Sequence, residues 1–99
     1  MKELADAQGI LVAFCRKWKV RELSVFGSFA RGDEREGSDL DLLVAFSPDA
    51  PWSLLDLAEM TEELSSQLGR PVDLVEEGAI INPFRRRAIS AERRILYAA

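Results

Sequence analysis

Asp39 and Asp41 are the residues in this chain whose type and spacing best suit catalysis. In an extended strand, residues two apart project from the same face, so these carboxylates would lie about 7 Å apart along the backbone. Two like charges side by side repel each other, and a divalent cation removes the conflict. Carboxylates so placed hold one or two Mg²⁺ ions, and metals about 3.5–4 Å apart support in-line phosphoryl displacement.

Gly27 and Ser28 form a second motif, and ten residues separate Ser28 from Asp39. Glycine permits close approach of the backbone, and exposed amides together with a serine hydroxyl hold phosphate oxygens. Arg31 follows one helical turn later and would meet the same phosphates. Taken singly, a Gly-Ser turn or an Asp pair on a solvated strand face is ordinary structure. In this order and spacing, they predict a phosphate cradle beside a metal clamp, which is what a nucleoside triphosphate requires.

The first half of the chain predicts the elements that would position these residues. Apolar residues at steps of three and four predict an amphipathic helix over residues 3–18, with the stripe Leu4, Ala7, Leu11, Phe14 and Trp18. Cys15 borders that stripe, which predicts an inert buried thiol. Residues 20–26 are rich in β-formers and residues 39–46 alternate in polarity, so both predict strands.

The second half predicts a helix, a strand and a last helix. Ser53 is suited to cap a helix that Gly69 ends, with the stripe Leu54, Leu57, Thr61, Leu64 and Leu68. Residues 71–76 predict a strand. Asn82 and Pro83 predict the start of the last helix, whose inner stripe would be Phe84, Ala88, Ala91 and Ile95.

These elements predict an α/β (α+β) fold in the order α-β-β-α-β-α, as one domain over residues 1–99. Helices would cover a small mixed sheet on one face and leave the other face free for a site. The chain starts with polar residues and has no run of 18 apolar residues, so we expect a cytoplasmic protein without a membrane segment.

Composition excludes several classes of site. The 99 residues include no histidine and one cysteine, which excludes an internal disulfide, a structural zinc site and hydrolases that depend on histidine. The net charge of −4 disfavours general nucleic-acid binding. Residues 45–77 carry one basic and eight acidic side chains, whereas residues 78–99 carry five basic side chains and one acidic side chain. Charge is therefore distributed unevenly along the chain.

The motifs resemble the signature of the DNA polymerase β-like nucleotidyltransferase superfamily, in Phe26-Gly27-Ser28, Arg31-Gly32 and Ser38-Asp39-Leu40-Asp41-Leu42. Nearly the whole chain is similar to the smallest branch, the minimal nucleotidyltransferase (MNT) antitoxins that pair with HEPN-domain toxins. The superfamily uses a third carboxylate on a later strand, and Asp73 is the matching position. Asp73 lies in an otherwise apolar strand, where a lone carboxylate is costly unless it has a partner.

The resemblance implies adenylyl transfer, in which a hydroxyl attacks the α-phosphorus of ATP and pyrophosphate leaves. Asp39 and Asp41 would hold two Mg²⁺ ions, and Asp73 would help hold the catalytic metal and accept the hydroxyl proton. Gly27 and Ser28 would bind the β- and γ-phosphates. The acceptor that the resemblance implies is a tyrosine of a cognate HEPN RNase toxin, without direct contact to nucleic acid.

Two other functions stay open: an antitoxin that masks its partner without catalysis, and a nucleotidyltransferase with another acceptor, such as a small molecule. A homo-oligomer and a hetero-oligomer with the toxin also stay open. Arg85, Arg86, Arg87, Arg93 and Arg94, placed on the last helix, form either a solvated face or an electrostatic docking surface. Trp52, expected in an exposed loop, could pack on the core, stack on adenine or anchor a partner.

Overall fold

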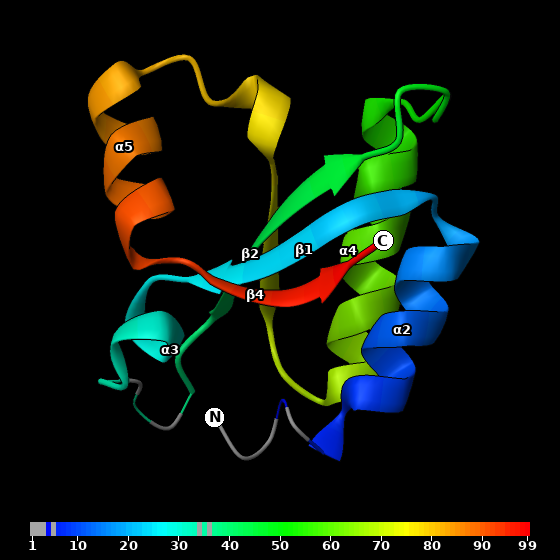
Figure 1. The fold of residues 1–99 in the computed structure, drawn as a ribbon. Helices are drawn as coiled ribbons and strands as arrows, with labels where there is room; N and C mark the ends of the chain where they lie inside the picture. The colour runs from blue at the N-terminus through cyan, green and yellow to red at the C-terminus, as the bar shows by residue number, and fades with distance from the viewer. Residues whose placement is uncertain (1–3, 5, 34, 36) are drawn as a thin grey trace.

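The computed structural model describes residues 4, 6–33, 35 and 37–99, which build a four-stranded mixed sheet with helices on both faces (Figure 1). The strands, in the order β3-β2-β1-β4 across the sheet, are Val72–Glu76, Leu40–Phe46, Val20–Phe26 and Arg94–Ala98. β1 runs antiparallel to β2 and to β4, and β2 runs parallel to β3. The α/β class is confirmed. In the described part of the chain, no helix is long and apolar enough to span a membrane.

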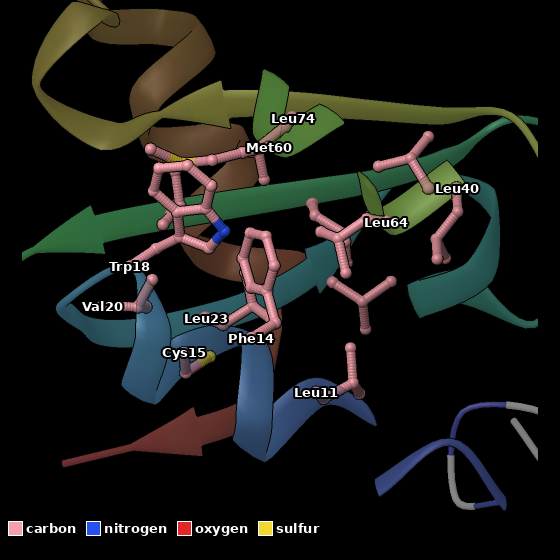
Figure 2. Close-up of a cluster of buried hydrophobic side chains, with 14 of the residues drawn as sticks. Leu11, Phe14, Cys15, Trp18, Val20, Leu23, Leu40, Met60, Leu64 and Leu74 are labelled. Atoms are coloured by element: carbon pink, nitrogen blue, oxygen red, sulfur yellow. The ribbon is translucent and has the colours of Figure 1, made fainter. Parts of the chain in front are cut away.

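Helices α2 (Gln8–Lys17) and α4 (Leu54–Leu68) cover one face of the sheet and enclose the main core (Figures 1 and 2). All five stripe residues of the first predicted helix are buried, as is Cys15. The helix predicted over residues 3–18 is interrupted, because Ala7 lies in a turn and α2 begins at Gln8; residues 3 and 5 lie outside the described residues. From the sheet, alternate residues of β2 point into this core: Leu40, Leu42 and Val44. The opposite alternation therefore leaves Asp41 on the other face.

Helix α4 begins and ends as its sequence predicts. The side chains of Ser53 and Asp56 each bond the other residue's backbone amide, and Gly69 ends the helix in the left-handed conformation. Leu54 was expected in the buried stripe, and this is wrong: it is 84% exposed, because the first turn lies where β2 ends at Phe46, beside a cavity rather than over the sheet. Met60 is fully buried in this core instead.

Helix α5 (Pro83–Glu92) lies over the opposite face, so the expectation that helices cover one face is corrected. Asn82 accepts bonds from the amides of Phe84 and Arg85, which confirms it as the N-cap. The predicted inner stripe is wrong, because Ile89 is the residue of α5 that is buried, in a second cluster with Phe26, Leu43 and Ile80. Phe84 is 78% exposed, because the first turn of the helix leans away from the sheet.

The chain ends in a strand rather than in the predicted helix. Strand β4 pairs with the free edge of β1, with Glu22 opposite Ala98 and Val25 opposite Arg94. Arg93 and Arg94 therefore do not lie on the last helix, and Ile95 is not part of its stripe. The Arg93 side chain bonds Glu22, which ties the start of β4 to β1.

Candidate active site

Asp41 and Asp73 lie side by side on the face of the sheet that α2 and α4 leave open. Each is the second residue of its strand, and the parallel register of β2 and β3 pairs them directly. Residues paired across neighbouring strands project from the same face of a sheet. Two of the three predicted carboxylates, far apart in sequence, are thus brought together.

Asp39 lies directly before β2, which begins at Leu40 and not at residue 39 as predicted. Its side chain is exposed, whereas Asp41 is partly buried. Burial raises the pKa of Asp41, and the negative charges of Asp73 and Asp39 raise this pKa further. Arg31 acts in the opposite direction, and Glu92 adds another negative charge. The fold therefore concentrates acidic charge around one partly buried carboxyl.

Gly27 brings the backbone against this carboxyl at the turn after β1. A Cβ atom at position 27 would lie 2.3 Å from Asp41 Oδ2, far inside van der Waals contact. Gly27 also has φ 71° and ψ −149°, a combination that glycine alone adopts readily. Since both the space and the backbone angles exclude a side chain, the turn requires glycine at this position.

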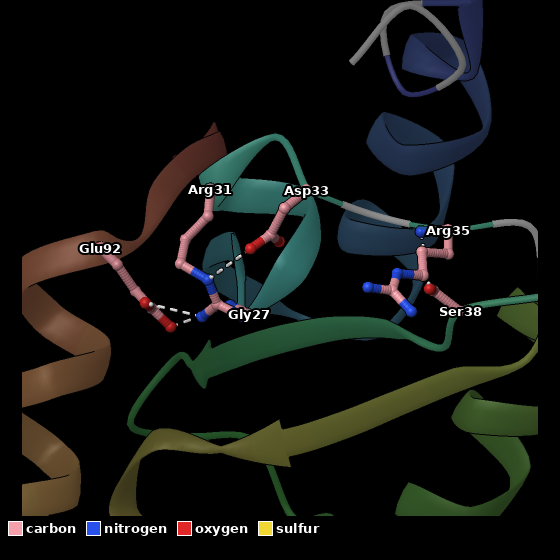
Figure 3. A network of polar contacts seen from close by, with 6 residues as sticks. All are labelled: Gly27, Arg31, Asp33, Arg35, Ser38 and Glu92. Atoms are coloured by element: carbon pink, nitrogen blue, oxygen red, sulfur yellow. Dashed lines mark hydrogen bonds and ion pairs between the residues drawn. The ribbon is translucent and has the colours of Figure 1, made fainter.

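Ser28 and Arg31 are the first and last residues of the short helix α3 (Ser28–Arg31) that follows this turn. Ser28 is half-buried, and Arg31 is exposed. Arg31 Nε donates to Asp33 Oδ2 at 3.3 Å, and its Nη1 donates to Glu92 Oε2 at 3.1 Å (Figure 3). Gly27 N–H donates to the other oxygen of Glu92 at 3.0 Å. Glu92, the last residue of α5, thus joins both predicted phosphate-binding groups.

Comparison with known proteins identifies this arrangement. The family described as "Nucleotidyltransferase domain" matches residues 8–96, which include every residue of the candidate site. The chain belongs to the nucleotidyltransferase domain family. The resemblance found from the sequence motifs is therefore confirmed at the level of the family.

Curated relatives of this nucleotidyltransferase are named as protein adenylyltransferases. "Putative protein adenylyltransferase MJ0128" of Methanocaldococcus jannaschii is 42% identical over 98 residues, which cover 93% of this chain and 96% of that protein. "Protein adenylyltransferase MntA" of Thermococcus cleftensis is 40% identical over 84 residues, which cover 81% of this chain and 83% of that protein.

Solved structures share the fold of this nucleotidyltransferase. A structure described as a "putative minimal nucleotidyltransferase" has a TM-score of 0.78 at 36% identity, and the match covers 94% of this chain and 92% of that chain. A toxin–antitoxin complex with AMP-PNP has a TM-score of 0.78 at 20% identity, and the match covers 93% of this chain and 73% of that chain. A third structure is the tri-AMPylated HEPN toxin of Shewanella oneidensis in complex with MNT antitoxin. It has a TM-score of 0.73 at 17% identity, and the match covers 97% of this chain and 73% of that chain. The last two matches show a likeness of fold alone.

The carboxylates of this nucleotidyltransferase suit a hard cation that is shared with a substrate. Among the described residues, no group of three or more Asp, Glu, Cys or His side chains is arranged to hold a metal ion unaided. Mg²⁺ is typically bound through one or two carboxylates together with substrate phosphates, rather than in an all-protein cage. The paired Asp41 and Asp73, whose mutual repulsion contributes to the raised pKa of Asp41, fit that mode of binding.

Other candidate residues lie away from the site. Trp52 packs edge-on against Trp18, with ring centroids 5.0 Å apart, and its Nε1–H donates to the carbonyl of Trp18 at 2.6 Å. Of the three roles left open for Trp52, the structure supports packing on the core.

Arg85, Arg86 and Arg87 are exposed on α5, and Arg86 also donates to the carbonyl of Ile80.

A cavity of about 810 Å³ lies at the opposite end of the strands, where Phe46 ends β2 and Glu76 ends β3. Arg21 at the start of β1 and Arg86 on α5 also line it. This cavity does not include Asp41, Asp73 or Gly27. We therefore place the candidate active site at the other end of the sheet, where Phe26 is paired with Asp41.

Sequence reasoning did not single out Glu92. Glu92 was one acidic residue in an arginine-rich segment predicted to form the last helix, and it lies far along the chain from Gly27 and Arg31. No local spacing connects these residues, because their contact depends on how α5 crosses the sheet. The one available signal was that Glu92 is the sole acidic residue among residues 78–99.

Proposed function

We propose that this nucleotidyltransferase transfers AMP from ATP to a hydroxyl group of a partner protein, and that the partner is a HEPN-type toxin modified on tyrosine. The observation that carries the proposal is the pairing of Asp41 with Asp73 beside a turn that only glycine fits. Relatives at 40–42% identity that are named protein adenylyltransferases support the protein acceptor. The shared fold of the MNT antitoxin bound to the AMPylated toxin is consistent with the toxin partner.

In this proposal the turn and α3 bind the triphosphate. The amide of Gly27 and the hydroxyl of Ser28 bind the β- and γ-phosphates, and the exposed guanidinium of Arg31 is within reach of the same group. Backbone amides and guanidinium groups form charge-assisted hydrogen bonds to phosphate, which fix its orientation as well as its position. The α-phosphate then lies toward Asp41, since Gly27 packs directly against that carboxylate.

The carboxylates supply the reactive end of the site. The acceptor oxygen forms a bond to the α-phosphorus, the bond from that phosphorus to the bridging oxygen breaks, and pyrophosphate leaves with the electron pair. The Asp73 carboxylate accepts the hydroxyl proton, consistent with its exposed position beside Asp41. Asp39, Asp41 and Asp73 would hold Mg²⁺, which would supply positive charge to neutralise the phosphates. Most of the rate enhancement would come from positioning and electrostatics.

The experiment combines the purified chain, ATP, Mg²⁺ and the co-expressed toxin, and measures the mass of the toxin. We expect the toxin to gain AMP on a tyrosine and to lose its RNase activity, and excess chelator to prevent both changes. Asp73→Asn should lower the rate by about 10²–10⁴-fold, the usual contribution of a general base, and leave ATP binding largely intact.

Asp49→Asn is the matched control, because Asp49 lies in an exposed loop and pairs with Lys19 away from the site. Its rate of transfer should equal that of the unchanged chain. Neutralisation of the toxin without a gain in mass would contradict the proposal and indicate masking. A rate for Asp73→Asn within tenfold of the unchanged chain would remove Asp73 from the role of base.

A further inference from the structure

The carboxylate of Glu92 contacts the two groups that the proposed function assigns to the nucleotide phosphates. Oε1 accepts from the amide of Gly27 at 3.0 Å, and Oε2 accepts from Nη1 of Arg31 at 3.1 Å (Figure 3). A carboxylate and a phosphate both offer anionic oxygens to such donors. The single N–H of Gly27 cannot be donated fully to Glu92 and to a phosphate at once.

We propose that Glu92 acts as an internal substitute for a nucleotide phosphate: it occupies the cradle in the free protein, and an incoming nucleotide must displace it. The inference rests on the proposed function, because it takes Gly27 and Arg31 as phosphate-binding groups. Glu92 thereby sets the affinity for nucleotide and keeps the Gly27 turn ordered when no nucleotide is bound.

The charges around Glu92 favour its displacement when a better ligand arrives. The negative charge of Glu92 makes a small contribution to the raised pKa of Asp41, so the carboxylates of Glu92 and Asp41 repel each other. The favourable contacts are those with Gly27 and Arg31, and Arg31 keeps a second partner in Asp33. A triphosphate that carries its own divalent cation can take over both donors and relieve the repulsion among the carboxylates.

The backbone around Glu92 allows the side chain to leave without moving the helix. Ile89, one turn earlier, is buried against the sheet, and Arg93, the next residue, bonds Glu22 on β1. Because both sides are anchored, we expect displacement to be a rotation of the Glu92 side chain, which is 28% exposed.

The test compares Glu92→Gln and Glu92→Ala with the unchanged chain, by calorimetry of ATP binding in the presence of Mg²⁺. Glutamine keeps the shape but accepts a weaker, uncharged hydrogen bond, and alanine removes the competitor. We expect affinity to rise in the order Glu, Gln, Ala, with alanine roughly 5- to 30-fold tighter, the equivalent of about 1–2 kcal/mol.

Glu63→Gln is the control, because Glu63, on α4 at the other face of the sheet, is also partly buried and pairs with a basic residue, Lys17. It removes the same charge, and its ATP affinity should not change. Hydrogen exchange at the Gly27 amide gives a second readout without nucleotide. We expect exchange to be slow in the unchanged chain, fast in Glu92→Ala, and slow again in that variant once Mg²⁺ and ATP are added.

Affinity that is equal or weaker in both Glu92 variants overturns the inference and leaves the proposed function standing. That result would make Glu92 a residue that positions the cradle for nucleotide rather than one that competes with it. If neither the unchanged chain nor the variants bind ATP, the proposed function fails, and the inference fails with it. If the Glu92 variants bind ATP more tightly but no AMP is transferred to a protein, the inference about Glu92 stands and the proposed protein acceptor is wrong.

Discussion

Several effects act on the single carboxyl group of Asp41. Partial burial raises its pKa, and so do the charges of Asp73 and Asp39, while Arg31 opposes them. A raised pKa means that the ionised form is less stable in the folded chain than in the unfolded chain. Ionised Asp41 therefore lowers the stability of the metal-free protein at neutral pH, which is the opposite of what a salt-bridged carboxylate does.

Asp41→Asn should consequently increase the Tm of the metal-free protein at pH 7, because it removes a charge that the fold disfavours. The gain should shrink as the pH falls through the raised pKa of Asp41, since the natural carboxyl then becomes neutral as well. Thermal unfolding in excess chelator from pH 7 to pH 4 measures this, with Asp49→Asn as the control that should show no gain. A lower Tm for Asp41→Asn at pH 7 would contradict the expectation.

Gly27 is constrained twice, by its backbone angles and by the carboxylate of Asp41. Gly32 also has a positive φ, of 77°, but a Cβ there would meet nothing within 4 Å. Gly32→Ala should therefore lose roughly 1–2 kcal/mol of unfolding free energy, the usual penalty of the left-handed region. Gly27→Ala should lose more and also displace Asp41. Equal losses in urea titrations of the two variants would show that the close contact with Asp41 is unimportant.

Helix α5 contacts the sheet less extensively than α2, α3 and α4 do, although it carries Glu92 to the site. Its N-cap is local, and its packing depends on Ile89 in the small cluster with Phe26 and Leu43. The rest of the helix surface is exposed or half-buried, including Phe84 and the arginines. The position of Glu92 thus depends on a small apolar contact and on the pairing of Arg93 with Glu22.

Ile89→Ala should lower the free energy of unfolding by about 2–4 kcal/mol, as expected for truncation of a buried isoleucine. Phe84→Ala removes a larger side chain from the same helix but should change stability by less than about 0.5 kcal/mol, because that side chain is exposed. Urea titrations of both variants show whether α5 packs on the sheet through Ile89 or through the apolar stripe that includes Phe84, as the sequence predicted. A larger loss for Phe84→Ala would mean that α5 packs through its other face.

At the scale of the whole molecule, opposite charges lie on different elements. The acidic residues concentrate in the segment 45–77, whereas α5 displays Arg85, Arg86 and Arg87 to solvent. Such a polarised surface steers a charged partner and makes association sensitive to salt. Arg86 also bonds the carbonyl of Ile80, so its replacement would disturb the start of α5 as well as the charge.

The variant with Arg85→Glu and Arg87→Glu should therefore slow association with the proposed toxin partner and leave ATP binding unchanged. Its association rate should also depend less on added salt. The control carries Arg16→Glu and Lys19→Glu, which change the net charge equally at exposed residues of another surface. Stopped-flow association at several salt concentrations measures the effect. Equal association rates for the two double variants would show that Arg85 and Arg87 belong to a solvated face and do not guide docking.

The sequence by itself determined the local elements and the motif residues. The apolar periodicity within α2, the N-cap Ser53, and Asn82 before Pro83 act over a few residues, so their structures follow from nearby chemistry. The spacing of Gly27, Ser28, Asp39 and Asp41 was visible for the same reason. The assignment of these residues to nucleotide and metal stays a prediction.

The tertiary structure decided the contacts between distant segments. Residues 94–98 have a helix-compatible composition, but the open edge of β1 offers them backbone hydrogen bonds, and they form β4. That pairing ends α5 at Glu92 and brings its carboxylate to Gly27 and Arg31. Likewise, the parallel register of β2 and β3 places Asp73 beside Asp41. Strand pairing and helix docking depend on surfaces that exist only once the chain has folded, so no local pattern encodes them.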